Sequence, residues 1–325
     1  MKLHLRSEFI IGSVLLLAML VIGTINPAFW HLDNIFNLLR NNIVIGIMAM
    51  GVLLILISGG IDVSFPAFAV ASAYITIKLV VFWQLPGVLL PILMSIIFGA
   101  LFGLINAFFV AKFKMIPLIV TLGTGGMVRG FLLGFVGTSM ININKMPRPL
   151  IDLSKLEIFS GLNADGTHYG LTVLVLFYVF TALAIHFLLK YTMLGRSIYA
   201  LGGDPVSAER AGFNIPGIQT FIYCLAGALA GFAGILHNSL IWLSNPRDMM
   251  GFELDVIAAV VLGGASIFGG KGTVLGTVLG VFMLVLVKNS LIIMKVDTTW
   301  QRVVVGVIIL AATAITAYRD KKTNA

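Results

Sequence analysis

Apolar residues fill most of the chain in long blocks, and short polar stretches separate them. Most blocks approach or exceed the length of about 20 residues that an α-helix needs to cross the hydrocarbon of a bilayer. Ten can be delimited, at residues 9–25, 41–58, 65–83, 87–111, 117–138, 169–189, 217–237, 253–268, 273–294 and 300–318. The eighth is short and glycine-interrupted, and the pair 253–294 could be divided differently. The pattern predicts an all-α polytopic membrane protein with about ten transmembrane helices in a single domain over 1–325.

Composition supports the membrane class. The chain is 59% hydrophobic and 10% charged, whereas a soluble domain carries about 25% charged residues. The net charge of +8 is scattered over many short loops, which argues against nucleic acid as a partner and fits the basic loops of a membrane protein. With one cysteine, Cys224, and five dispersed histidines, no disulfide within the chain, metal site or bound cofactor is expected.

Residues 1–25 have the charge and apolar pattern of either a signal peptide or a first transmembrane helix. The sequence from Thr24 to Pro27 is a poor cleavage site, so we interpret the segment as a helix that stays. With the N-terminus in the cytoplasm, an even number of helices returns the C-terminus to the cytoplasm.

The distribution of Lys and Arg favours this orientation, because cytoplasmic loops carry the excess of positive charge. Eleven fall on the predicted inner side: Lys2, Arg6, Lys112, Lys114, Lys190, Arg196, Arg210, Lys271, Arg319, Lys321 and Lys322. Five fall in outer loops: Lys145, Arg148, Lys155, Arg247 and Lys295. Trp30, Trp83, Trp242 and Trp300 all lie at predicted outer ends, where tryptophan anchors at the interface. The outer loop 139–168 is then interpreted as a solvated lid.

The polar stretch 190–216 carries its own folded element. Asp204 followed by Pro205 is typical of an N-cap with proline in the first helical turn. A short helix is expected over 206–213, ended by Gly212 or Asn214. Gly202 and Gly203 are expected to form the turn before it.

Two further polar sites interrupt the apolar segments. Asp62 follows Gly59 and Gly60 and precedes Pro66, which suggests a broken helix near the inner face; Asp62 could instead be the N-cap of the next helix. Arg129 lies inside an apolar segment and should face the bundle interior or a wet cavity, either paired structurally or lining a pathway.

Glycines recur at helical spacing, at Gly126, Gly130 and Gly134, and residues 226–234 form a nearly continuous small face. Such faces let membrane helices approach closely. The glycine-rich stretch around Lys271 is not a P-loop, because that motif needs Ser or Thr after the lysine and Gly272 stands there. The chain is therefore not expected to be an enzyme or to hydrolyse ATP.

Four strings together resemble the permeases of ABC importers for ribose and other simple sugars, a family that includes autoinducer-2 permeases. They are GRSIYALGGDPVSAERAG at 195–212, SGGIDVSF at 58–65, TLGTGGMVRG at 121–130 and FELDVIAAVVLGG at 252–264, which continues as GGKGTVLGT at 269–277. The family usually has glycine where this chain has Pro66, so the local backbone can differ. The resemblance implies a type II ABC-importer permease bundle.

The resemblance also implies residue roles. The loop 190–216 would couple to the ATPase, through Gly195, Arg196, Gly202, Gly203, Asp204, Pro205, Ala208, Glu209, Arg210 and Gly212. The translocation or structural motifs would comprise Ser58, Asp62, Ser64, Thr121, Thr124, Arg129, Glu253 and Asp255. Ala208 and Ala211 are expected to give the coupling helix a small surface for close approach.

The implied partners are an ABC ATPase subunit that carries ATP and Mg, an extracytoplasmic solute-binding protein, a second permease copy or paralogue, and the lipid of the bacterial inner membrane. Pentoses, hexoses, autoinducer-2 and nucleosides all remain open as substrates. The alternative is an ion-coupled secondary transporter of a small polar solute. It would need a relay of ionisable residues at the midplane, for which Asp62 and Arg129 are too few.

Overall fold

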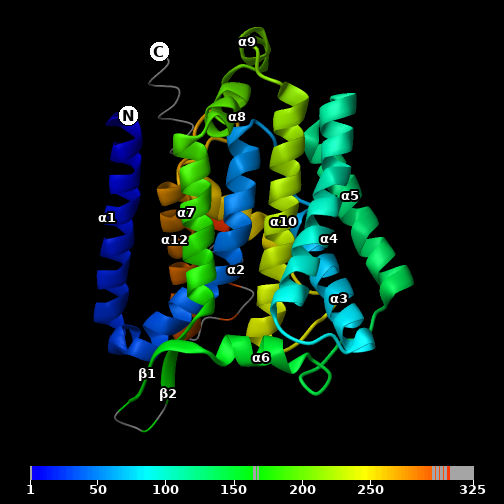
Figure 1. The fold of residues 1–325 in the computed structure, drawn as a ribbon. Helices are drawn as coiled ribbons and strands as arrows, with labels where there is room; N and C mark the ends of the chain where they lie inside the picture. Colours follow the sequence, from blue (N-terminus) through cyan, green and yellow to red (C-terminus); the bar gives the residue numbers. More distant parts are fainter. Residues whose placement is uncertain are drawn as a thin grey trace.

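Long helices running side by side make up most of the molecule (Figure 1). The computed structural model describes residues 2–163, 166, 168–294, 297, 300, 303, 306 and 307. Within them, eight helices are long and apolar enough to cross a membrane. They are α1 (Lys2–Ile25), α2 (Leu32–Ile57), α3 (Phe65–Trp83), α4 (Leu89–Ala107, continued as a π-helix over Phe108–Lys112), α5 (Pro117–Phe131, continued as a π-helix over Leu132–Val136), α7 (Leu174–Tyr191), α10 (Ile215–Ile241) and α12 (Val274–Ile293).

Shorter elements connect these helices at both ends of the bundle. They are the 3₁₀ helix Pro27–Trp30, α6 (Arg148–Lys155), β1 (Glu157–Leu162), β2 (His168–Thr172), α8 (Met193–Gly203), α9 (Pro205–Arg210) and α11 (Phe252–Leu262). The two strands form an antiparallel hairpin in which Phe159 lies opposite Leu171. The all-α polytopic architecture predicted from the sequence is confirmed, with this hairpin as a small addition.

Helix α2 is the centre of the bundle. Its residues from Asn42 to Ile57 are all buried, and α7, α10, α11 and α12 all pack against it. Complete burial of this part of α2 is what its composition predicts, because residues 43–57 include no polar side chain that would have to face outward. By contrast, α1 packs against α12 at the edge of the bundle and leaves most of its apolar residues exposed.

Helices α4 and α10 pack through glycine. Gly99 and Gly103 of α4 face α10, and a Cβ at Gly99 would overlap the carbonyl oxygen of Gly227. A Cβ at Gly231 would overlap the carbonyl oxygen of Ser95, whose hydroxyl donates a 2.7 Å hydrogen bond to the carbonyl of Gly231. The small face predicted over 226–234 therefore brings two backbones into contact.

Helix α5 presents its glycines differently. A Cβ added at Gly126, Gly130 or Gly134 would meet no atom within 4 Å. The same residue type at the same spacing is thus packed against a neighbour in one place and open in another.

The eighth predicted segment, 253–268, does not span the bundle as a helix. Helix α11 has 11 residues, about 16 Å at 1.5 Å per residue, and turns at 263–273 lead from it to α12. Of the tenth predicted segment, 300–318, the structure describes only residues 300, 303, 306 and 307.

The outer loop 139–168 is more ordered than a solvated lid. Helix α6 lies across the end of the bundle, next to the hairpin (Figure 1), and buries Leu150 and Ile151. The hydroxyl of Ser154 accepts a 2.9 Å hydrogen bond from the indole of Trp242 at the end of α10. The solvated interpretation is therefore wrong for α6, because this helix is amphipathic and packs its apolar residues against the bundle.

Candidate functional site

The short helix α9 projects from one end of the bundle, the same end at which α1 begins (Figure 1). Asp204 is its N-cap: Oδ1 accepts a 3.0 Å hydrogen bond from the backbone N–H of Val206. The Ser207 hydroxyl also donates to Asp204, and these hydrogen bonds, the Ser207 one foremost, hold the pKa of the carboxyl below its usual value. The charged form that caps the helix is thus favoured.

The other end of α9 closes with a glycine. Gly212 has φ +88°, the left-handed conformation that suits glycine. The N–H of Phe213 donates to the carbonyl of Ala208, and that of Gly212 donates to the carbonyl of Glu209, which is the Schellman arrangement. The helix itself covers Pro205–Arg210, shorter than the predicted 206–213, because the residues after Ala211 form the cap.

The side chains that α9 exposes are not the ones that the sequence predicted. Ala208 is 3% exposed, so its small side chain packs inward and offers no surface to a partner. Val206, Ser207, Glu209 and Arg210 are exposed instead. The expectation that Ala208 forms a contact surface is wrong, because the direction of so short a helix is set by packing and not by its sequence.

Helix α8 connects α9 to the bundle, and its glycines are not a simple turn. Gly202 and Gly203 form the end of α8. A Cβ at Gly202 would overlap the carbonyl oxygen of Ile57, whereas one at Gly203 would meet nothing within 4 Å. The predicted turn is therefore wrong: Gly202 allows the end of α8 to contact the end of α2.

Three separate segments interlock at this point. The N–H of Gly270 donates a 2.8 Å hydrogen bond to the carbonyl of Ile57, which is the atom that Gly202 packs against. The Tyr199 hydroxyl donates a 2.6 Å hydrogen bond to the carbonyl of Gly272. A Cβ at Gly269 would also overlap the Cα of Gly59. The strings at 58–65, 195–212 and 269–277 therefore meet near the end of α2.

Gly195 and Arg196 lie at the start of α8. A Cβ at Gly195 would overlap the carbonyl oxygens of Leu188 and Leu189, and its N–H donates to the N-cap hydroxyl of Thr192. Arg196 is exposed. Gly195 is therefore needed for the tight α7–α8 junction, while the Arg196 side chain is free to contact a partner.

A buried polar network lies behind the α2–α3 turn. The Asp62 carboxylate accepts 2.6 Å hydrogen bonds from the N–H and the hydroxyl of Ser64. Asn106 of α4 donates to the Ser64 hydroxyl at 2.8 Å and accepts from the Thr124 hydroxyl at 2.5 Å. The Thr121 hydroxyl accepts a 3.3 Å hydrogen bond from the N–H of Val63 and donates a 3.4 Å one to the carbonyl of Ile61. Four of the predicted motif residues, from two distant strings, are thus brought together.

The network decides between the two interpretations of Asp62. Ser64, not Asp62, occupies the N-cap position of α3, and Asp62 holds Ser64 in place. Pro66 falls in the first turn of α3, where its missing N–H leaves no bond unmade. Ser58 is the C-cap of α2, and its hydroxyl donates a hydrogen bond to the carbonyl of Ile55.

The sequence analysis did not identify Asn106 as part of this network. A single amide side chain in an otherwise apolar segment is the signal that could have identified it.

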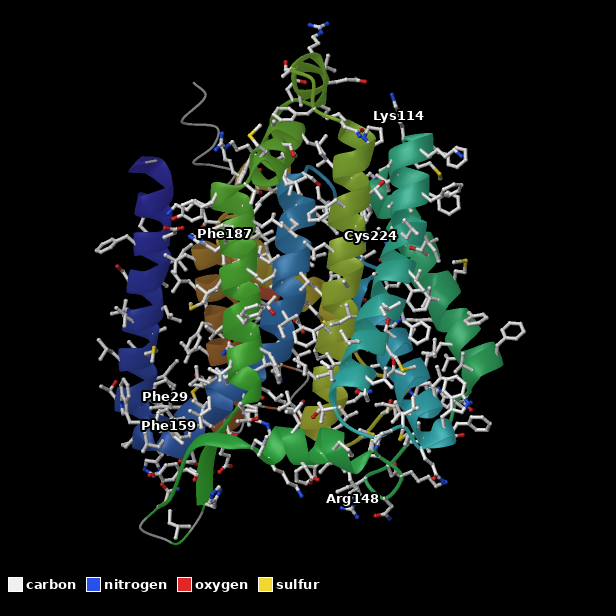
Figure 2. The ribbon with its side chains drawn as sticks, viewed as in Figure 1. Phe29, Lys114, Arg148, Phe159, Phe187 and Cys224 are labelled. Carbon is white, nitrogen blue, oxygen red and sulfur yellow. The ribbon has the colours of Figure 1, made fainter. Side chains whose placement is uncertain are left out.

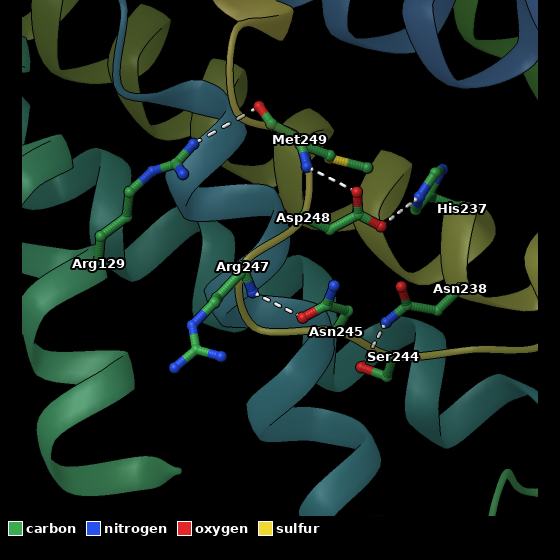
Figure 3. A network of polar contacts seen from close by, with 8 residues as sticks. All are labelled: Arg129, His237, Asn238, Ser244, Asn245, Arg247, Asp248 and Met249. Atoms are coloured by element: carbon green, nitrogen blue, oxygen red, sulfur yellow. Dashed lines mark hydrogen bonds and ion pairs between the residues drawn. The ribbon is translucent and has the colours of Figure 1, made fainter. Parts of the chain in front are cut away.

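The side chain of Arg129 on α5 contacts the loop 242–251 between α10 and α11. Its guanidinium Nη2 lies 3.5 Å from the carbonyl oxygen of Met249 (Figure 3). In the same loop the Asp248 carboxylate lies 3.0 Å from His237 Nε2 of α10 and accepts from the N–H of Met249. Arg129 thus contacts the 242–251 loop that leads into α11.

The acidic residues of α11 differ from each other. Asp255 pairs with Lys288 of α12 at 2.5 Å. Glu253 is half-buried, and its Oε2 has no hydrogen-bond partner among the described residues. Asp255 therefore joins two helices, a role that the sequence motif did not reveal.

The described residues contain no group of three or more metal-ligating side chains. A cavity of about 500 Å³ lies beside α9, between the 58–60 turn, the start of α5 and the start of α10. Pro205, Val206 and Glu209 line it. The exposed residues Val206 and Glu209 of α9 thus also line this cavity.

Comparison with known proteins places the arrangement in a family. Residues 34–313 match the model of the permease component of the branched-chain amino acid transport system. The chain belongs to this permease family. It is therefore a multi-pass membrane subunit of a transport system and not an enzyme, and the ion-coupled alternative is set aside.

Three curated relatives match over nearly the whole chain. The ribose import permease protein RbsC of Haemophilus influenzae is 31% identical over 96% of this chain and 93% of its own length. RbsC of Escherichia coli is 32% identical over 93% of this chain and 91% of its own length. The D-allose transport system permease protein AlsC of Escherichia coli is 30% identical, over 94% and 90%. No solved structure matches the chain.

Proposed function

We propose that the chain is the membrane-spanning permease subunit of a bacterial ABC importer for a monosaccharide or sugar-like molecule. The relatives named for ribose and D-allose support the substrate class. The observation that carries the proposal is α9, a helix capped at both ends, which exposes Val206, Glu209 and Arg210 and stands on α8.

The ATPase subunit would bind α9 and carry the ATP and Mg. Because Gly202 packs on the carbonyl of Ile57 and Gly270 donates to the same atom, a displacement of α9 and α8 would pass to the ends of α2 and α12. A rigid-body shift of this kind is a known way for one packed element to switch another. The bundle would then alternate between its outward-open and inward-open states.

In this proposal the α9 end faces the cytoplasm of a cell with an inner membrane, as do both termini. Lys114 lies toward this end and Arg148 at the opposite end (Figure 2), so both ends carry charge that could anchor at lipid headgroups. The α6 end would receive the binding protein. A second permease copy or paralogue would cover the open face around Gly126 and Gly130, which meets nothing in this chain.

The docking test changes an exposed side chain, because Ala208 is buried. Val206 is 56% exposed, and Val206→Glu places a carboxylate in the first turn of α9, where the helix tolerates it. We expect the variant to insert normally but to lose co-purification with the ATPase and stimulated ATP hydrolysis in nanodiscs. Leu162→Glu is the matched control, since Leu162 is 69% exposed in the hairpin at the opposite end. Normal association of the Val206→Glu variant would refute α9 as the docking element.

Orientation has a separate test. Cysteines at Ser207 and Asn163, introduced singly into a Cys224→Ala background, should react with an impermeant reagent from opposite sides of the membrane. Labelling of both from the outside would show that the proposed orientation is wrong.

A further inference from the structure

Three asparagines of α2 lie on one face of the helix. Asn34, Asn37 and Asn41 follow the i, i+3, i+7 spacing that places side chains above one another. Asn37 and Asn41 are exposed, and Asn41 lies nine residues into the helix, about 14 Å along its axis. An exposed amide can use its hydrogen-bonding capacity only where water or a ligand reaches it, as in a cavity.

A cavity is present at this face. It has a volume of about 480 Å³ and lies between α2, α10, α11 and α12, within the size range of small-molecule sites. Its polar lining consists of Asn37, Arg40, Asn41, His237, Lys288 and Asn289. Phe252 and aliphatic side chains form the rest. Apolar walls with a few convergent polar groups are typical of binding sites.

The charged groups of the lining are already engaged by the chain. Lys288 pairs with Asp255 at 2.5 Å, and His237 lies 3.0 Å from Asp248. Arg40 Nη2 donates a 2.7 Å hydrogen bond to the carbonyl of Leu240. Lys288 and His237 therefore face carboxylates of this chain, while Arg40, whose partner is a neutral carbonyl, keeps its positive charge.

The amides are the unused groups. In the part of the chain that the structure describes, the side chains of Asn37 and Asn41 make no hydrogen bond. Asn289, by contrast, donates a 2.7 Å hydrogen bond to the side-chain oxygen of Asn34, and this bond fixes the Asn289 amide beside the cavity. Each free amide offers two donor hydrogens and an accepting oxygen. A hydroxyl, which also both donates and accepts, is the group that fits this pair.

We propose that this cavity is a binding subsite for a neutral, polyhydroxylated molecule of monosaccharide size. The amides of Asn37 and Asn41 bind its hydroxyls, and its C–H faces lie against Phe252 and the aliphatic walls. The proposal rests on the function proposed above and adds the place where substrate first contacts the permease. The cavity lies toward the end where α2 begins and α10 ends, opposite α9 (Figure 1).

The test uses thiol protection in the full-length chain. Asn41→Cys and, separately, Asn37→Cys are made in the Cys224→Ala background and placed in nanodiscs. Labelling by a charged, impermeant thiol reagent is timed with and without D-ribose, D-allose and a panel of other neutral pentoses and hexoses, and with the phosphates of these sugars. We expect both cysteines to react, and at least one sugar to slow the reaction about tenfold when it fills nine-tenths of the sites.

Asn163→Cys in the hairpin is the control, and its labelling should not change with sugar. Unreactive cysteines at both positions, or labelling that no neutral sugar slows, would overturn the proposal. Protection by sugar phosphates alone would also overturn it, because it would make the cavity an anion site.

A second readout separates this inference from the proposed function. With the ATPase and binding protein added, Asn41→Leu should raise the KM for uptake about tenfold more than it lowers the maximal rate, because one wall of the subsite can no longer bind hydroxyls. If the unaltered chain supports no ATP-driven uptake, the proposed function fails, whereas the protection experiment stands without ATPase. If the unaltered chain supports normal uptake and the Asn41→Leu variant keeps its KM, the subsite proposal is refuted while the proposed transport function stands.

Discussion

Polar side chains gather toward both ends of the bundle, and the two groups differ in how their hydrogen-bonding capacity is used. Toward the α9 end, Asp62, Ser64, Asn106 and Thr124 are buried and bond one another at 2.5–2.8 Å. Toward the opposite end, the exposed amides of α2 line a cavity of about 480 Å³. Satisfied groups at membrane depth join helices, while unsatisfied groups in a cavity are available to a ligand. The comparison predicts stability effects at the first site and functional effects at the second.

The largest effect is expected at the packed junction of the α9 end. Gly202→Ala places a methyl group on the carbonyl oxygen of Ile57, and backbone on both sides prevents relief. We expect almost no monodisperse protein after size-exclusion chromatography in detergent. Gly203→Ala is the adjacent control, since a Cβ there meets nothing within 4 Å. Equal yields of the two variants would contradict the interlocking of α8 with α2.

A smaller loss is expected from the buried network. Asn106→Leu removes the donor to Ser64 and the acceptor for Thr124, two buried hydrogen bonds that contribute about 0.5–1.5 kcal/mol each. Ser64 and Thr124 keep their bonds to Asp62 and to the carbonyl of Val120. Thermal unfolding in detergent should show the decrease. Asn41→Leu should leave the unfolding temperature nearly unchanged, because the amide it removes has no partner in the described chain. Similar destabilisation by both variants would contradict the inference that the buried network stabilises the fold whereas the exposed α2 amides do not.

Arg129 tests a region between these extremes. Arg129→Leu loses the contact with the Met249 carbonyl and should impair assembly or uptake, whereas Arg129→Lys should retain part of both because a cation remains. Uptake in proteoliposomes, normalised to inserted protein, is the measurement. Full activity of the leucine variant would mean that the contact between Arg129 and the 242–251 loop has no role in transport.

The smallest effect is expected at the cap of α9. Asp204→Ala removes the acceptor for the Val206 N–H, so α9 should fray and association with the ATPase should weaken partially in a pull-down. Asp204→Asn retains a capping oxygen and should bind nearly as well as the unaltered chain. If both variants bind equally weakly, the negative charge rather than the cap is what the partner requires.

Much of the architecture could be predicted because its causes are local. Runs of apolar residues identify helices that a bilayer can hold, and an Asp-Pro pair with a following glycine identifies a short capped helix. The direction of the α9 faces could not be predicted, since one and a half turns carry no periodic signal and packing alone buries Ala208.

The sequence by itself determined the eight described helices that are long and apolar enough to cross a membrane, and where the short helix α9 begins. It could do so because hydropathy and capping act between residues close in the chain. Only the tertiary structure brought Ser64, Asn106 and Thr124 within hydrogen-bond distance, placed Gly202 against Ile57, and left the α2 amides facing a cavity. These contacts join residues that are tens to hundreds of positions apart. They depend on how the helices pack, and in a membrane that packing is set by small residues and polar pairs rather than by hydrophobicity.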